Sequence, residues 1–175
     1  MNMSKIRKYQ IFSIIFTFVL GTILHFTYEW SGENKIVGFF SSVNESTWEH
    51  LKLLFFPMLI TTIIGVFYFK KDLPNFLCSK TIGILIAIAF TVIFFYTYTG
   101  ILGKNIAAID ISSFFIATIL GDFVTYVLIV NKFKCNNKFA IFLLLAVFVN
   151  FIVFTYNPIK IGLFKDPVTG NYGIS

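Results

Sequence analysis

Five apolar stretches of about 20 residues alternate along the chain with shorter polar segments. The stretches cover residues 9–28, 51–69, 81–102, 109–130 and 139–156. At 1.5 Å per residue, a helix of this length crosses a hydrocarbon core of about 30 Å, whereas a tilted membrane strand needs only about 9–11 residues. The pattern therefore predicts an all-α polytopic membrane protein. Its bundle of five transmembrane helices forms a single membrane domain, residues 1–175, which ends in a tail, residues 157–175.

The composition agrees with a membrane protein and excludes an ordinary soluble domain. Hydrophobic residues make up 57% of the chain and charged residues 13%, against about 45–50% and 25% in soluble domains. Lys5, Arg7 and Lys8 precede the first apolar stretch, as basic residues do in a secretory signal peptide. The stretch is too long for a signal peptide and no small-residue cleavage site follows it, so we predict a first membrane helix.

Basic residues divide unequally between the two sides of the predicted bundle. The side of the N-terminus carries Lys5, Arg7, Lys8, Lys70, Lys71, Lys80, Lys132, Lys134 and Lys138, and the opposite side carries Lys35, Lys52, Lys104, Lys160 and Lys165. Because basic loops tend to stay in the cytoplasm, this division predicts a cytoplasmic N-terminus and an external C-terminus. The net charge of +6 then serves membrane insertion. The expected partner is the lipid bilayer, and no nucleic acid is indicated.

Residues 42–52 place two carboxylates, a histidine and a lysine at the start of the second predicted helix. Ser42-x-x-Glu45 and Ser46-x-x-Glu49 both fit a capping box, in which a hydroxyl and a carboxylate bind the free N–H groups of a helix start. The helix is therefore expected to begin near Asn44. Acidic residues at a helix start also complement the helix dipole. Capping thus explains much of this segment without a functional site.

A histidine one turn inside the first predicted helix is not explained by capping. His25 lies in a run that otherwise carries no charge, and ionisable residues in membrane segments usually face the bundle interior. The candidate outer-face polar site consists of His25, Glu45, Glu49, His50, Lys52 and Asp110. Within it, His25, Glu49 and His50 are the candidate ligands of a divalent metal ion, which would activate water for hydrolysis. The alternative is a hydrogen-bonded histidine–glutamate pair, because no HExxH-type spacing and no other cofactor is evident.

A second candidate site lies deeper in the membrane. Asp122 stands in the fourth apolar stretch, and Thr118 and Tyr126 lie four residues before and after it, on the same helix face. This candidate intramembrane polar site has two interpretations. One is a proton or ion path. The other is hydrogen bonding between helices by a protonated acid.

The tail combines turn signals with a short apolar run, residues 159–164. It is too short to span the membrane and too apolar to remain free in water. We therefore expect it to fold back over the outer ends of the helices, close to the loop between the first two helices.

The two cysteines do not indicate a site of their own. Cys78 and Cys135 both fall in predicted cytoplasmic loops. Because thiols stay reduced in the cytoplasm, neither a structural disulfide nor a thiolate metal site is indicated.

Three segments carry a resemblance to a known family. They are residues 24–32, residues 164–170 and the pattern Val-Asn-Glu-Ser-x-Trp-Glu-His-x-Lys at residues 43–52. Through them the whole chain resembles a family of small, uncharacterised integral membrane proteins of bacteria. The resemblance implies a multi-pass protein of the bacterial cell membrane with five helices, and it names no reaction.

Three functional hypotheses follow from these observations. The first is a small solute-handling or transport-related subunit with an outer-face polar pocket, which requires both polar sites to face the bundle interior. The second is a membrane-embedded metal-dependent hydrolase, which requires a bound metal ion. The third is a structural protein that docks a membrane protein partner or a second copy of itself, with the charged segment as a folding scaffold.

Overall fold

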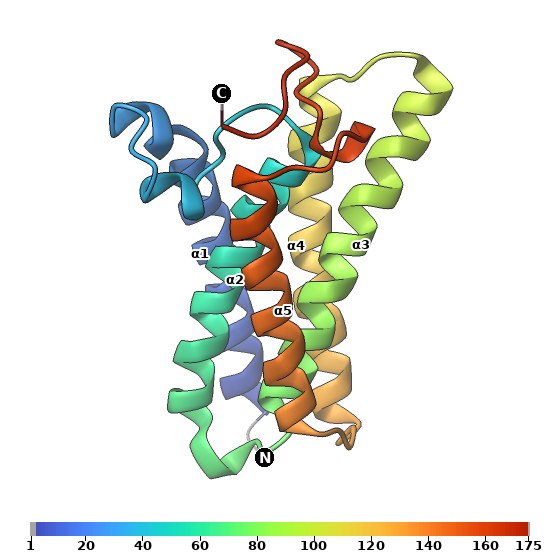
Figure 1. The fold of residues 1–175 in the computed structure, drawn as a ribbon. Coiled ribbons are helices and arrows are strands. Elements are labelled where there is room, and N and C mark those ends of the chain that lie inside the picture. The colour runs from blue at the N-terminus through green and yellow to red at the C-terminus, as the bar shows by residue number, and fades with distance from the viewer. Residues whose placement is uncertain (1–2, 175) are drawn as a thin grey trace.

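The protein forms a bundle of long helices (Figure 1). The computed structural model describes residues 3–174, and all of its long elements are α-helices. Within this range, the helices long and apolar enough to cross a membrane are α1 (Met3–Trp30), α2 (Thr47–Phe69), α3 (Phe76–Leu102), α4 (Ala107–Val130) and α5 (Asn137–Tyr156). The all-α class with five such helices is therefore confirmed.

Two helices begin earlier than the apolar pattern predicts. Helix α1 begins at Met3 and α3 at Phe76, five or more residues before the apolar stretches that start at residues 9 and 81. An apolar stretch marks the part of a helix that suits hydrocarbon, and polar residues can extend the same helix beyond it. The sequence-based placement of Lys80 in a loop is therefore wrong, because this residue belongs to α3.

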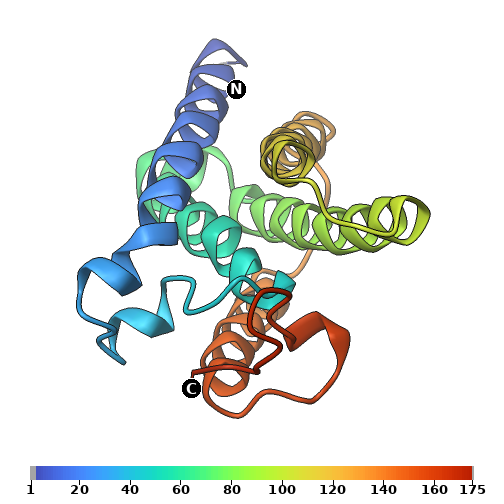
Figure 2. The same cartoon turned by 90° about the horizontal axis from the view of Figure 1, so that it is seen from above.

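The bundle has two distinct ends (Figure 1). We call the end where α1 begins the N-terminal end; the α2–α3 and α4–α5 connections also lie there. The opposite end, the tail end, carries the α1–α2 loop, the α3–α4 loop and the tail. Viewed along the bundle, α2 lies in the middle with α1, α3 and α5 around it (Figure 2). Its fully buried residues Leu54, Phe55 and Met58 belong to the main hydrophobic core.

Helices α3 and α4 approach each other closely through two glycines. A Cβ atom added at Gly121 would lie 2.7 Å from the carbonyl oxygen of Gly83, and one added at Gly83 would collide with the backbone of Gly121. Small residues allow this backbone contact between membrane helices, where dispersion forces replace the hydrophobic effect. The contact fixes the position of α4 and therefore of Asp122, the next residue.

The tail folds back onto the tail end of the bundle, as the sequence predicts. The backbone N–H of Ile174 donates to the carbonyl oxygen of Thr155 at 3.2 Å. The Asn44 side chain donates to the carbonyl oxygen of Gly173 at 2.9 Å. Phe164 is buried and its ring centroid lies 4.8 Å from that of Trp48. The tail thereby covers the start of α2 and the end of α5.

The two cysteines are paired at the N-terminal end. Cys78 lies in the first turn of α3 and Cys135 in the loop before α5, and they form a disulfide with their Cα atoms 6.3 Å apart. This Cα separation is in the usual range for a disulfide. The expectation that no disulfide forms is thus wrong. The sequence places the two residues 57 positions apart, and only the packing of the α4–α5 loop against α3 brings them together.

Candidate metal centre

The position of the site follows from where α2 begins. The hydroxyl of Ser46 accepts a hydrogen bond from the backbone N–H of Glu49 at 3.3 Å and caps the helix. Of the second predicted capping box only the Ser46 half forms, because the Ser46 N–H donates to Asn44 Oδ1 at 2.9 Å and the Glu49 carboxylate accepts from the Val43 N–H at 3.2 Å. Glu45 consequently precedes the helix, and its side chain lies off the regular helix surface. The expectation of a helix start near Asn44 is wrong by about one turn.

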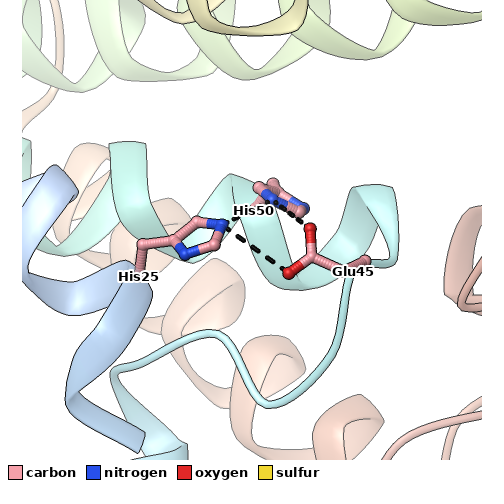
Figure 3. A group of neighbouring side chains, drawn as sticks. All are labelled: His25, Glu45 and His50. Atoms are coloured by element: carbon pink, nitrogen blue, oxygen red, sulfur yellow. Dashed lines mark hydrogen bonds and ion pairs between the residues drawn. The ribbon is translucent and has the colours of Figure 1, made fainter. Parts of the chain in front are cut away.

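This start places three side chains in one group, His25, Glu45 and His50, which we call the rim group (Figure 3). His25 comes from α1, and Glu45 and His50 flank the first turn of α2. One ligand atom from each residue lies within 4.8 Å of the other two. The Nε2 atoms of His25 and His50 are 3.3 Å apart. The Glu45 carboxylate lies 3.4 Å from His50 Nε2 and 3.7 Å from His25 Nε2.

These spacings are close to those of a metal site. Zinc binds imidazole nitrogen and carboxylate oxygen at about 2.0–2.1 Å, so two of its tetrahedral ligands lie about 3.3–3.4 Å apart. The two histidine nitrogens meet this value at 3.3 Å, whereas the two distances to Glu45, 3.4 Å and 3.7 Å, involve different carboxylate oxygens. The side chains are about one-third to one-half exposed, at 31% for His25, 34% for His50 and 47% for Glu45. Water can therefore reach the group.

The backbone orients the His50 ring toward the group. His50 Nδ1 lies 2.9 Å from the carbonyl oxygen of Ser46, so this nitrogen carries a proton and donates it. In a neutral imidazole, Nε2 then has only a lone pair, which faces the Glu45 carboxylate and Nε2 of His25. Three arrangements satisfy this geometry: an Nε2–H of neutral His25 that donates to His50, a second proton on His50 that is donated to Glu45, or a metal ion held by all three residues. A carbonyl that fixes the far nitrogen is also the usual outer-shell partner of a metal-bound histidine.

The carboxylate of the rim group is held in its ionised form. Hydrogen bonding to His50 lowers the pKa of Glu45 below its ordinary value, and the nearby His25 acts in the same direction. Partial burial opposes this shift and is the smaller effect. At neutral pH the rim group therefore contains an anionic oxygen donor.

Glu49 and Lys52 do not belong to the rim group. They form a buried ion pair with each other, one turn into α2. Lys52 also donates to the carbonyl oxygen of Gly38 at 2.8 Å, and Thr155 donates to Glu49 at 2.8 Å. The pair thus connects α2 to the α1–α2 loop and to α5. Its contacts satisfy both charges within the protein.

Asp110 also stands apart from the rim group. Its carboxylate, in the first turn of α4, accepts a hydrogen bond from the hydroxyl of Tyr98 in α3. This contact closes the α3–α4 hairpin at the tail end.

The deeper candidate, Asp122, is buried and paired with Lys80 of α3. Lys80 also donates to the hydroxyl of Ser13 at 2.7 Å, and this hydroxyl lies 3.1 Å from both Asp122 Oδ2 and Thr61 Oγ1. The network therefore joins α1, α2, α3 and α4. Among residues 3–174, Thr118 and Tyr126 form no hydrogen bond with Asp122; Thr118 instead donates to the Phe114 carbonyl oxygen at 2.9 Å.

Several polar groups around this network lack a partner. Within the described part of the chain, the amide of Gln10 and the hydroxyls of Thr17 and Ser79 are buried without a hydrogen bond. Gln10 and Thr17 lie on the same face of α1 as Ser13, because helix residues three or four apart are neighbours. The bundle interior is therefore polar at this level, on the side nearer the N-terminal end.

Comparison with known families gives one match. The family described as "Family of unknown function (DUF6512)" matches residues 1–174. The chain belongs to the DUF6512 family. No curated protein and no solved structure matches this DUF6512 chain. Its function therefore has to be argued from its own residues.

Two members of the Asp122 network are not predicted from the sequence. Lys80 lies before the third apolar stretch, which predicts a loop, but it pairs with Asp122; Ser13 binds both of them. A signal for Ser13 was present, because Gln10, Ser13 and Thr17 are spaced by three and four residues in an apolar stretch. Polar residues at that spacing form one stripe on a helix and indicate an inward face.

Proposed function

We propose that this protein is a membrane protein whose rim group binds a divalent transition metal ion, Zn²⁺ in particular, and uses it for hydrolysis. The observation that carries the proposal is the convergence of His25, Glu45 and His50, whose ligand atoms all lie within 4.8 Å of one another. A metal ion would be held by all three residues at once, and the alternative is a hydrogen-bonded group without an ion.

The donor set favours zinc over other common divalent ions. Two imidazole nitrogens and one carboxylate suit Zn²⁺, whereas Mg²⁺ and Ca²⁺ prefer oxygen ligands. Three protein ligands leave the fourth tetrahedral position for water, which is the pattern of catalytic zinc sites. Zinc lowers the pKa of bound water to about 7.

The chemistry that follows is hydrolysis of an ester or amide next to the membrane. His25, Glu45 and His50 would hold the ion, and the ion would supply Lewis-acid activation of water for such a hydrolysis. The partial exposure of the rim group supports a substrate that reaches it from the membrane surface.

Zinc should stabilise the protein in a way that depends on the rim group. In chelator-treated protein in detergent, Zn²⁺ at about 100 times its dissociation constant should add about 2.7 kcal/mol of stability. The expected rise in melting temperature is about 5–10 °C. Mg²⁺ should give no comparable rise, and His50→Ala should abolish the response to zinc.

The matched control for this experiment is Glu29→Gln. Glu29 is an exposed acid on the same helix as His25 and does not belong to the rim group. Its replacement should leave the zinc response intact. An equal zinc response in wild type and His50→Ala would show that the ion binds elsewhere and would refute the proposal.

The proposed orientation places the rim group outside the cell. In a Cys78→Ser/Cys135→Ser background, a membrane-impermeant thiol reagent added to intact cells should label Lys35→Cys, in the α1–α2 loop, and spare Lys134→Cys, in the α4–α5 loop. The excess of basic residues at the N-terminal end supports this result, whereas the Cys78–Cys135 disulfide at the same end favours the opposite orientation. Labelling at position 134 with position 35 protected would reverse the orientation.

Solute handling is the second candidate function. The observation that favours it is the set of unpartnered buried polar groups, Gln10, Thr17 and Ser79, around the Lys80–Asp122 pair. A polar solute or water inside the bundle would satisfy these groups. The metal proposal ranks first because Lys80 already neutralises Asp122, whereas the rim group is partly exposed and brings three metal-binding side chains together.

A further inference from the structure

An open cavity of about 500 Å³ lies at the N-terminal end, at the opposite end of the bundle from the rim group. It is formed between the first turns of α1 and the last turns of α2. Its lining includes Ser4, Lys5 and Lys8 from α1, together with the tyrosines Tyr9 and Tyr68. No acidic residue is present among the described residues that line it. The cavity lining therefore carries two basic side chains, Lys5 and Lys8.

The lining changes from charged to apolar along the cavity. Lys8 and Phe12 are four residues apart on α1, as are Ile64 and Tyr68 on α2, so each pair lies along one helix face. Phe12 is 44% exposed and Ile64 40% exposed, both in membrane-spanning helices. The lysines lie toward the helix start, and the apolar residues lie deeper. This polarity is that of a phospholipid, with a charged head and a hydrocarbon chain.

The position of Lys5 is fixed by aromatic rings. Its Nζ atom lies 4.5 Å from the ring centroid of Tyr68 and 5.6 Å from that of Phe69. Cation–π contacts of this kind hold the ammonium group at the cavity wall.

We propose that this cavity binds an anionic glycerophospholipid. The phosphate diester contacts Lys5, Lys8 and Ser4, and an acyl chain follows Phe12 and Ile64. A free phosphate ion would leave the apolar part of the cavity unfilled, which is why a lipid is the better occupant. The predicted orientation puts the cavity at the cytoplasmic leaflet, where anionic lipids give a negative surface potential.

The test is lipid binding to the full chain, purified in detergent and measured by native mass spectrometry. Phosphatidylglycerol should bind more tightly than phosphatidylcholine with the same acyl chains, and inorganic phosphate should not compete at equal concentration. Lys5→Gln/Lys8→Gln should weaken phosphatidylglycerol binding about 30-fold, because each lysine near anionic lipid contributes about fivefold.

Two control variants distinguish binding in the cavity from attraction to basic residues in general and from loss of binding through misfolding. Lys132→Gln/Lys134→Gln removes two exposed charges at the same end outside the cavity and should change the affinity less than about twofold. Lys5→Arg/Lys8→Arg keeps the charge and should keep the binding. The proposal would be overturned if the two lipids bound equally tightly or if inorganic phosphate displaced phosphatidylglycerol. It would also be overturned if the two glutamine double variants lost equal affinity for phosphatidylglycerol, or if Lys5→Arg/Lys8→Arg lost as much affinity as Lys5→Gln/Lys8→Gln.

Discussion

Replacing either member of the buried Lys80–Asp122 pair alone should destabilise the protein by about 3–5 kcal/mol. Both side chains are fully buried and neutralise each other between α3 and α4. Lys80→Met leaves the carboxylate of Asp122 without its counter-charge, and Asp122→Leu does the same to the ammonium group of Lys80. Thermal or denaturant unfolding in detergent measures the effect.

The double variant Lys80→Met/Asp122→Leu gives the sharper result. Replacing a buried ion pair by apolar residues of similar size is often neutral or stabilising, so most of the lost stability should return. Lys134→Met, an exposed cation at the same end, should have little effect. If the two single losses simply add in the double variant, the two charges do not interact as described.

Removing any one ligand of the rim group should nearly eliminate bound metal. His25→Ala, Glu45→Gln and His50→Ala each delete one of three donors. We expect Zn²⁺ affinity to fall by at least about 100-fold, because loss of an outer-shell partner alone typically costs about 10–100-fold. Zinc titration against a competing chelator measures the affinity. Because the three side chains are partly exposed, these changes should not unfold the bundle.

Glu29→Gln again provides the comparison for these variants. It removes an acid from the same end of the bundle and should retain wild-type zinc affinity. Glu49→Gln should behave unlike the rim-group variants and unlike Glu29→Gln, because Glu49 is the buried partner of Lys52. It should lower thermal stability at any zinc concentration. Loss of zinc in Glu29→Gln as well as in the rim variants would mean that surface charge, and not the rim group, binds the ion.

Much of the fold could be predicted from the sequence because lipid imposes strong rules. A long apolar stretch has to be helical to satisfy its backbone, so five such stretches gave five helices. The cap at Ser46 was also predictable, since its hydroxyl stands three residues before Glu49. Burial of Asp122 followed from the cost of placing an acid against lipid.

The contacts between residues far apart in the sequence could not be predicted from the apolar pattern. Lys80 follows a polar connection, and lysines there usually remain in the loop; its partner Asp122 lies 42 residues away. The pairing of Cys78 with Cys135 depends on the same long-range packing. Hydrophobic patterns specify which face of a helix is buried, and they carry no information about which helix that face meets.

Which of Glu45 and Glu49 joins the histidines depends on where α2 begins, to within one helical turn. A helix that began near Asn44 would place both carboxylates on one face, since they are four residues apart. The helix begins after Ser46 instead, so Glu45 joins the two histidines and Glu49 turns inward to Lys52. The structure thus separates a carboxylate that stabilises the fold from one that remains available for a ligand.

The most direct test of this account is the metal content of wild-type protein purified at neutral pH without added chelator. Elemental analysis should find about one zinc ion per chain in the wild type and almost none in His50→Ala, with both proteins folded and monodisperse. A wild-type protein that holds no transition metal, even after incubation with Zn²⁺ and removal of the excess, would contradict the proposed metal centre.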